Sequence, residues 1–219
     1  MVGINSETGL KMARCSAIEK ADLEAVEAAL LRSKRPRRDV CLFALGVNTG
    51  LRISELLSIK FLDVFDASGR VRDVLVIEKA HCKGKQRRRE IPLSPVAKKA
   101  IIQATEEAFA LGRSQPHGSF FSAVSHSGPI SRQQAYKIIS AALKAAGITK
   151  TRGTHTARKT YAAMLLEKVE VEYRAGRIRV FPLLAVQLGL GHQDIKTTQR
   201  YLEGGIESVN QIIQRGVSA

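Results

Sequence analysis

A tyrosine near the C-terminus of this chain follows groups that could turn it into a nucleophile. Tyr201 closes the stretch Leu188-Gly-Leu-Gly-His192-Gln-Asp-Ile-Lys-Thr-Thr-Gln-Arg-Tyr201. A phenol has a pKa of about 10 and is a weak nucleophile at neutral pH. It needs neighbours that stabilise developing negative charge and others that transfer protons. Residues of these kinds stand in four short motifs, at Arg52, Lys83, His155, Arg158 and His192.

Each motif is weak when it is taken alone. Arg52 ends Thr49-Gly-Leu-Arg52 and precedes a predicted short helix at 53–59, where free backbone N–H groups favour anions. Judged locally, it could equally be a solvated surface arginine. His155 and Arg158 are three residues apart on a predicted helix and so share a face. That spacing could aim both side chains at one phosphate, but it also arises often by chance.

The motifs are far more specific when they are taken together in their order along the chain. Thr-Gly-Leu-Arg, a lysine before glycine, His-x-x-Arg and Leu-Gly-His followed nine residues later by tyrosine occur in succession. In this order they resemble the tyrosine recombinase (phage integrase) family, and the resemblance extends from about Ser16 to about Gly205.

The resemblance implies a mostly α-helical catalytic domain with a small antiparallel β-sheet, an α+β fold. It also implies that Tyr201 attacks the scissile phosphodiester of DNA and leaves a 3′-phosphotyrosyl link and a free 5′-hydroxyl. Arg52 and Arg158 would bind the non-bridging oxygens, since planar bidentate donors suit a phosphate. His155 and His192 would help to transfer protons and to stabilise the phosphorane.

A basic loop between two predicted strands, 74–77 and 89–93, carries the expected general acid. The family pattern Gly-Lys-Gly matches Cys82-Lys83-Gly84, so the first glycine is missing. The resemblance implies that Lys83 protonates the leaving oxygen, and Lys85 is the alternative. The whole loop could also serve as an electrostatic patch.

Neither a cofactor nor a metal is expected. The phosphotyrosyl link keeps the energy of the cleaved bond, so a second 5′-hydroxyl reverses the step without ATP. The sequence has no Gly-x-x-x-x-Gly-Lys-Ser/Thr loop for a nucleotide. It also shows no cluster of carboxylates that indicates a catalytic metal.

The charge of the chain favours a polyanionic partner. Its 35 Lys and Arg residues against 20 Asp and Glu give a formal charge of +15. No apolar run is long enough to span a bilayer, and no signal peptide opens the chain. Basic residues in two stretches are the expected DNA contacts: Lys34, Arg35, Arg37, Arg38, Lys79, Lys85, Arg87 and Arg88.

Capping and stop residues predict three further helices in the rest of the chain. Asp39 is predicted to cap one helix, Ser94 another that runs to about Leu111, and Ser131 a third that stops at Gly147. Glu55 is predicted to hold Arg52 or a backbone group in place. The segment 167–180 is longer than the family pattern and is predicted to be a surface excursion.

Three parts are predicted: an arm at 1–15, a catalytic domain at 16–203 and a tail at 204–219. In the tail, two glycines precede an apolar stripe of Ile206, Val209 and Ile213 that would dock in cis or in trans. Most of the family carry a separate N-terminal DNA-clamp domain, and Arg52 lies too near Met1 for one. The chain is therefore expected to be a catalytic-domain-only recombinase or a piece of a longer protein.

The predicted function is site-specific recombination, whether integration, excision or inversion. The expected partners are double-stranded DNA, further copies of this chain in a tetramer on paired sites, and an accessory DNA-bending protein. The expected location is the prokaryotic cytoplasm, at the nucleoid. The alternatives are a type IB topoisomerase, an inactive DNA-binding regulator with the same fold, and a metal-dependent nuclease.

Overall fold

A computed structural model describes residues 17–78, 88–126, 128–151 and 153–191. Several predictions fall outside these described residues. They concern the arm, the tail, and the individual residues Lys79, Lys83, Lys85, Arg87, His192 and Tyr201.

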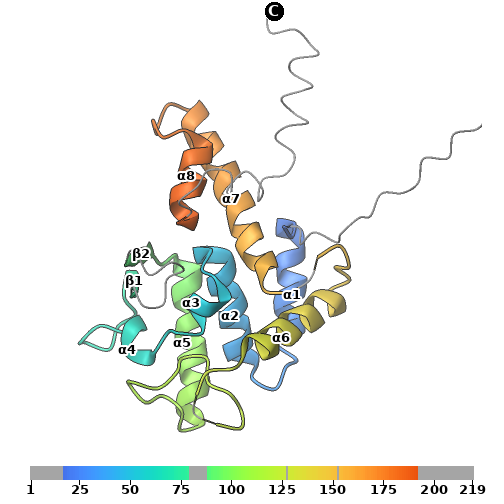
Figure 1. The fold of residues 1–219 in the computed structure, drawn as a ribbon, viewed down its shortest axis with the longest axis vertical. Helices are drawn as coiled ribbons and strands as arrows, with labels where there is room; N and C mark the ends of the chain where they lie inside the picture. The colour runs from blue at the N-terminus through green and yellow to red at the C-terminus, as the bar shows by residue number, and fades with distance from the viewer. Residues whose placement is uncertain (1–16, 79–87, 127, 152, 192–219) are drawn as a thin grey trace, which may run out of the picture.

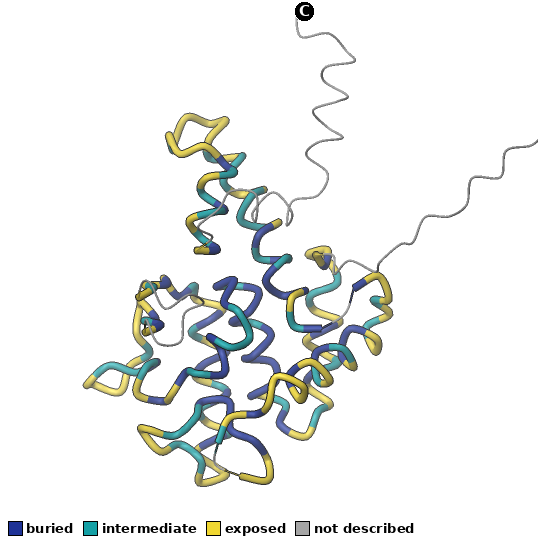
Figure 2. Tube along the Cα trace, viewed as in Figure 1, coloured by how far each residue is buried: buried dark blue, intermediate teal, exposed yellow. Residues whose placement is uncertain are grey.

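The first part of the described chain is a set of helices around α2. Ten residues of α2 are buried, and α2 packs against both α5 (Pro95–Ala110) and α7 (His155–Arg174) (Figures 1 and 2). Gly50 ends α2 in the left-handed conformation that a glycine commonly adopts after a helix. The elements are η1 (Lys20–Asp22), α1 (Leu23–Leu30), α2 (Pro36–Thr49), α3 (Ile53–Leu56) and α4 (Phe61–Val64).

A two-stranded antiparallel sheet lies at one side of the helices (Figure 1). Strands β1 (Val74–Ile77) and β2 (Arg89–Pro92) pair so that Leu75 lies opposite Ile91. Both of these side chains are buried, and they turn one face of the sheet towards the core. The predicted strands, and with them the predicted α+β class, are confirmed for the described residues.

Two helices begin at serine caps, as predicted. The Ser94 hydroxyl accepts a hydrogen bond from the Ala97 N–H at the start of α5 (Pro95–Ala110). Ser131 forms a capping box with Gln134 at the start of α6 (Arg132–Ala145). After α6, Gly147 has φ +78°, which glycine adopts at no steric cost.

The last described helices form a hairpin that projects from the body (Figure 1). They are α7 (His155–Arg174) and α8 (Pro182–Leu190). Ala162, Val186 and Leu190 are buried between them. The segment 167–180, predicted to be a surface excursion, contains no buried residue, and α7 continues unbroken through its first half to Arg174. Only the turn that follows is irregular, and a Glu172–Arg177 ion pair braces it.

The basic stretch at 32–38 is partly internal, which corrects two predicted DNA contacts. Arg35 is 5% exposed, and its Nε lies 2.9 Å from a Glu107 carboxylate oxygen. Arg38 is 4% exposed, pairs with Asp39 at 2.7 Å and donates to the Ser122 carbonyl oxygen. These guanidinium groups are occupied inside the protein, so their assignment as phosphate contacts is wrong.

The predicted helix cap at Asp39 is wrong as well. Helix α2 begins at Pro36, so Asp39 lies inside its first turns rather than at its start. The Asp39 carboxyl is buried beside Arg38. Burial raises its pKa, and the Arg38 guanidinium opposes that rise. The carboxylate therefore stabilises a buried arginine and does not cap a helix.

Arg38→Ala should lower the free energy of unfolding by about 3 kcal/mol, because it leaves a buried carboxylate without its cation. Arg37→Ala is the matched control, since Arg37 is exposed and its backbone contact to Glu107 survives the change. That variant should unfold within about 0.5 kcal/mol of the unmodified chain. Urea unfolding measures both. Equal stability of the two variants would contradict the structural role of Arg38.

Candidate active site

Arg52 stands at the start of α3 and is held by Glu55. The Arg52 backbone N–H donates to Glu55 Oε2 at 2.7 Å, and its Nη1 donates to Oε1 at 3.1 Å. Glu55 is fully buried, whereas the Arg52 side chain is 22% exposed. This confirms the prediction that Glu55 holds Arg52, and it leaves part of the guanidinium at the surface.

The turn before Arg52 depends on Gly50. Its φ is +60°, a conformation that side-chain-bearing residues rarely adopt. A Cβ at this position would also lie 2.3 Å from the Tyr161 ring. Glycine is therefore required both by the backbone and by the close packing of α7. The turn consequently lies directly beside α7, close to Arg158.

Arg158 joins three parts of the fold. Its Nη1 donates to the Gly50 carbonyl oxygen, and its Nη2 donates to the Leu190 carbonyl oxygen at 2.8 Å. Arg158 is 1% exposed. One side chain on α7 thus links the turn before α3 to the end of α8, two residues before His192 in the sequence.

His155 opens α7 and lies one turn before Arg158. The residue is exposed on its outer side. Partial burial lowers the pKa of the imidazole, and the neighbouring cations Arg158, Arg52 and Lys159 lower it further. The proximity of these charges places His155 in the same cluster as both arginines. The lowered pKa favours the neutral ring, which can donate or accept a proton at neutral pH.

Arg89 belongs to this cluster and was not predicted from the sequence. It begins β2, and its side chain is 14% exposed. Its Nη1 donates to Glu55 Oε2 and its Nη2 to the Gly189 carbonyl oxygen, both at 3.2 Å. The alternation of side chains along β2 could have predicted this position, because Arg89 lies two residues before the buried Ile91 and so faces inward.

The other tyrosines occupy structural positions. Tyr161 packs against α8, beside Leu165 and Leu166. Burial raises the pKa of its phenol, which makes it a poorer nucleophile. Tyr136 is 47% exposed on α6, and Tyr173 is 42% exposed and packs edge-to-face on Phe181.

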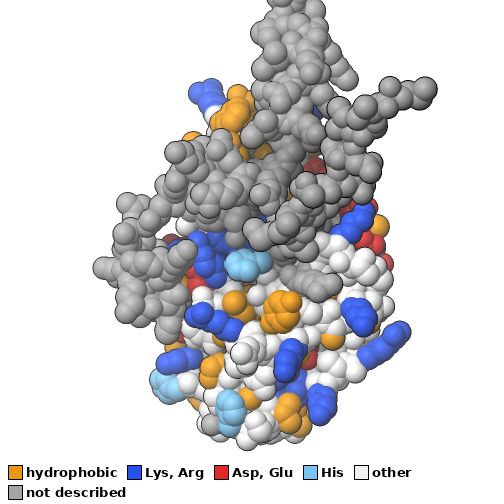
Figure 3. Space-filling view, turned by 45° about the vertical axis from the view of Figure 1, so that its right-hand side comes forward, with side chains coloured by type: hydrophobic (Ala, Val, Ile, Leu, Met, Phe, Trp, Pro, Cys, Tyr) orange, Lys and Arg blue, Asp and Glu red, His pale blue; other side chains and the backbone are white. Residues whose placement is uncertain are grey.

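One face of the molecule carries mostly basic charged side chains. Lys and Arg side chains are spread over the face shown in Figure 3, and acidic ones are few there. Of the predicted DNA contacts within the described ranges, Lys34, Arg37 and Arg88 are exposed. Arg88 pairs with Glu90 at 2.5 Å, an exposed contact that water screens.

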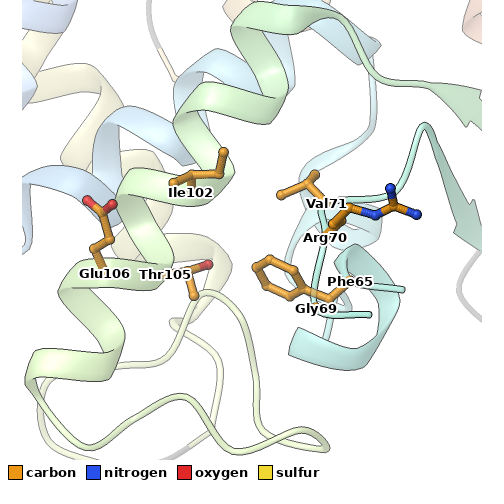
Figure 4. A pocket seen from close by; sticks show the side chains of 7 residues that line it. All are labelled: Phe65, Gly69, Arg70, Val71, Ile102, Thr105 and Glu106. Carbon is orange, nitrogen blue, oxygen red and sulfur yellow. The ribbon is translucent and has the colours of Figure 1, made fainter. Parts of the chain in front are cut away.

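A hollow on the outer side of α5 is separate from this chemistry. It has a volume of about 330 Å³, and Phe65, Val71 and Ile102 line it together with Thr105 and Glu106 (Figure 4). None of the predicted catalytic residues contributes to it. Among the described residues, no group of three His, Cys, Asp or Glu side chains is arranged to hold a metal ion. None of the described helices is long and apolar enough to cross a membrane.

Comparisons with known proteins show the family to which the chain belongs. A family model described as the phage integrase family matches residues 17–204, and the chain belongs to that family. It is 35% identical over 191 residues to tyrosine recombinase XerD of Halalkalibacterium halodurans, a match that covers 82% of this chain and 55% of that protein. It is 28% identical over 180 residues to the probable integrase/recombinase YoeC of Bacillus subtilis, covering 82% and 84% of the two chains.

Solved structures with the same fold are recombinases. The XerA recombinase matches with a TM-score of 0.65 at 19% identity, over 93% of this chain and 66% of that one. The XerH site-specific recombinase bound to its difH substrate matches with a TM-score of 0.65 at 20% identity, over 90% and 53%. At this identity the likeness shows the fold alone. The chain spans about half the length of the XerD relatives that it matches.

Proposed function

We propose that this chain is the catalytic part of a site-specific DNA recombinase. The observation that carries the proposal is a junction in which Arg158 binds the turn before α3 and the end of α8, Glu55 holds Arg52, and His155 lies within the electrostatic influence of both arginines. These groups stand in the order of the recombinase motifs, in a chain that belongs to the family. The matched region supports a catalytic domain at 16–203, followed by a tail at 204–219.

In this proposal Tyr201 attacks the scissile phosphorus while the bond from phosphorus to the 5′-oxygen breaks. The tyrosine becomes a 3′-phosphotyrosyl ester, and the leaving oxygen takes a proton from Lys83. Arg52 and Arg158 stabilise the non-bridging oxygens, and His155 and His192 assist proton transfer. Arg158 is buried in this structure, so its phosphate contact requires a rearrangement around it when DNA binds.

A suicide DNA substrate tests the function directly. A nick near the cleavage point lets the short fragment that carries the free 5′-hydroxyl diffuse away. Without that hydroxyl the reaction cannot reverse, so the covalent protein–DNA adduct accumulates. Formation of an adduct that resists denaturant and persists in EDTA supports the proposal and excludes a metal-dependent nuclease. Exchange of strands between two sites separates recombination from topoisomerase-like relaxation. Neither the structure nor the comparisons favour relaxation, nor do they favour an inactive regulator.

The proposed partners are double-stranded DNA and further copies of this chain on paired sites, with an accessory DNA-bending protein. Two structural relatives are XerH and the Tn1549 transposon integrase, each solved with DNA. The proposed place of action is bacterial DNA in the cytoplasm, at the nucleoid. The exposed Lys34, Arg37 and Arg88, with Lys79, Lys85 and Arg87, are the proposed DNA contacts.

DNA binding should weaken steeply with salt, because a chain of charge +15 releases counterions when it meets phosphates. With about six phosphate contacts, affinity should fall on the order of 1,000-fold between about 50 and 200 mM salt. Fluorescence anisotropy with a labelled site measures the slope. A complex whose affinity is independent of salt would contradict the proposed electrostatic contacts.

Deleting the chain after Gly205 should impair assembly more than folding. Ile206, Val209 and Ile213 form an apolar stripe that would dock on a neighbouring subunit. The truncated chain should still bind one site but give fewer two-site complexes and less recombined product in native gels. Circular dichroism controls for folding. An unfolded truncated chain, or full-rate recombination by it, would refute docking in trans.

A further inference from the structure

We propose that Arg89 is a positioning residue that holds the Arg52–Glu55 pair and the end of α8 in one arrangement. This inference rests on the proposed recombinase function and deepens it, because it adds a residue to the machinery that orders the site. Arg89 would act through its neighbours and would not itself contact the reacting phosphate.

The first argument is electrostatic. Glu55 is fully buried, and its oxygens receive the Arg52 backbone N–H, the Arg52 guanidinium and the Arg89 guanidinium. A buried carboxylate needs paired cations to offset its loss of water. With Arg52 alone the pair would be neutral. With Arg89 added, two cations face one anion, and the group keeps a net positive charge to offer to a phosphate.

The second argument is geometric. The two ends of the Arg89 guanidinium bind different elements, Glu55 on α3 and the Gly189 carbonyl oxygen in the last turn of α8. The Arg89 side chain also packs closely on the glycine that ends this helix, because a Cβ at Gly191 would lie 2.8 Å from Arg89 Nε. Only a planar fork makes both contacts at once. A lysine ammonium is a point charge and could satisfy one of them.

The third argument is the place of Arg89 in the chain. It is the first residue of β2, the strand that follows the loop carrying Lys83. The helix that it holds ends at Leu190, two residues before His192 in the sequence. A single side chain of β2 therefore contacts both α3 and the end of α8. Changing it should disturb their mutual placement without removing either of them.

Arg89→Ala should slow single-turnover cleavage of a suicide substrate by about 10- to 100-fold, the range expected when reacting groups are misplaced. DNA affinity should stay within a few-fold, since Arg89 is not a proposed DNA contact. Arg89→Lys should recover only part of the rate, because it restores the charge beside Glu55 and not the contact to Gly189. Guanidinium ion, well below denaturing concentration, should partly rescue Arg89→Ala.

Hydrogen exchange of the free protein gives a second readout that needs no catalysis. Arg89→Ala should speed amide exchange both in α3 and in the last turn of α8. The matched control is Arg70→Ala, which removes an arginine from an exposed ion pair with Asp66. It should change neither exchange at these two places nor cleavage.

The outcomes distinguish a failure of the positioning role of Arg89 from a failure of the recombinase function. Wild-type rates in Arg89→Ala, or full activity in Arg89→Lys, would overturn the positioning role. Unchanged amide exchange in both α3 and the last turn of α8 would also overturn it. The same holds for a cleavage defect that matches the loss of folded protein and that guanidinium ion does not rescue. If the unmodified chain forms no adduct at all, the recombinase function fails, while the exchange measurement still decides whether Arg89 couples α3 to α8.

Discussion

Tyr201→Phe should form no covalent adduct with a suicide DNA substrate, while its DNA affinity stays close to that of the unmodified chain. A single hydroxyl oxygen forms the bond to phosphorus, and phenylalanine removes only that atom. Affinity comes from many Lys and Arg contacts to the phosphate backbone, none of which the change touches. Denaturing gels of the cross-linked product measure the chemistry, and anisotropy of a labelled duplex measures binding.

The other three tyrosines supply the controls. Tyr161→Phe should retain adduct formation, because the ring packs between α7 and α8 and its phenol has a raised pKa. Tyr136→Phe and Tyr173→Phe change side chains on α6 and near the end of α7 that are about half exposed. An adduct that persists in Tyr201→Phe and disappears in one of these three variants would transfer the role of nucleophile to that residue.

Local signals predicted much of the fold. The serines before α5 and α6 cap those helices because their hydroxyls lie next to the unpaired N–H groups of the first turn. Gly50 and Gly147 end helices because both positions need a left-handed backbone. The two strands were predicted from short apolar runs around a basic loop. Each of these features depends on residues only a few positions apart.

Features that depend on distant partners were not predicted. The run of charge at 32–38 does not reveal which arginines a helix turns inward, and Arg35 is buried because Glu107 lies opposite it. Likewise, the partners of Arg89 stand 34 and 100 residues away in the sequence. The charged segment after Glu167 was predicted to be a surface excursion, but its charges did not reveal that its first half extends α7 to Arg174. Gly176, with φ +69°, marks the true end of that helical run.

The same distinction between local signals and distant partners applies to the candidate site. The motif residues Arg52, His155 and Arg158 were predicted from the family resemblance that their motifs carry, and they lie close together in the structure. What holds the cluster could not be predicted in the same way. Arg158 is anchored by carbonyl oxygens of Gly50 and Leu190, and a sequence gives no indication of which backbone oxygen a buried guanidinium will meet.

Lys83→Ala should slow cleavage by about 10²- to 10⁴-fold, the contribution expected of a general acid. The leaving 5′-oxygen is a poor leaving group as an alkoxide, so it needs a proton as its bond to phosphorus breaks. Lys85→Ala should have a much smaller effect, because in the proposed register Lys85 contacts the DNA backbone only. Single-turnover cleavage of one suicide substrate compares the two variants, and anisotropy confirms that both bind the DNA.

A substrate with sulfur in place of the bridging 5′-oxygen isolates the proton-transfer step. A thiolate leaves readily without a proton, since a thiol has a pKa of about 8.5. The sulfur substrate should therefore restore Lys83→Ala to nearly the rate of the unmodified chain. It should not restore a variant that has lost an arginine, because that defect concerns charge on the non-bridging oxygens. Rescue of Lys85→Ala in place of Lys83→Ala would show that the loop register is shifted by two residues and that Lys85 is the acid.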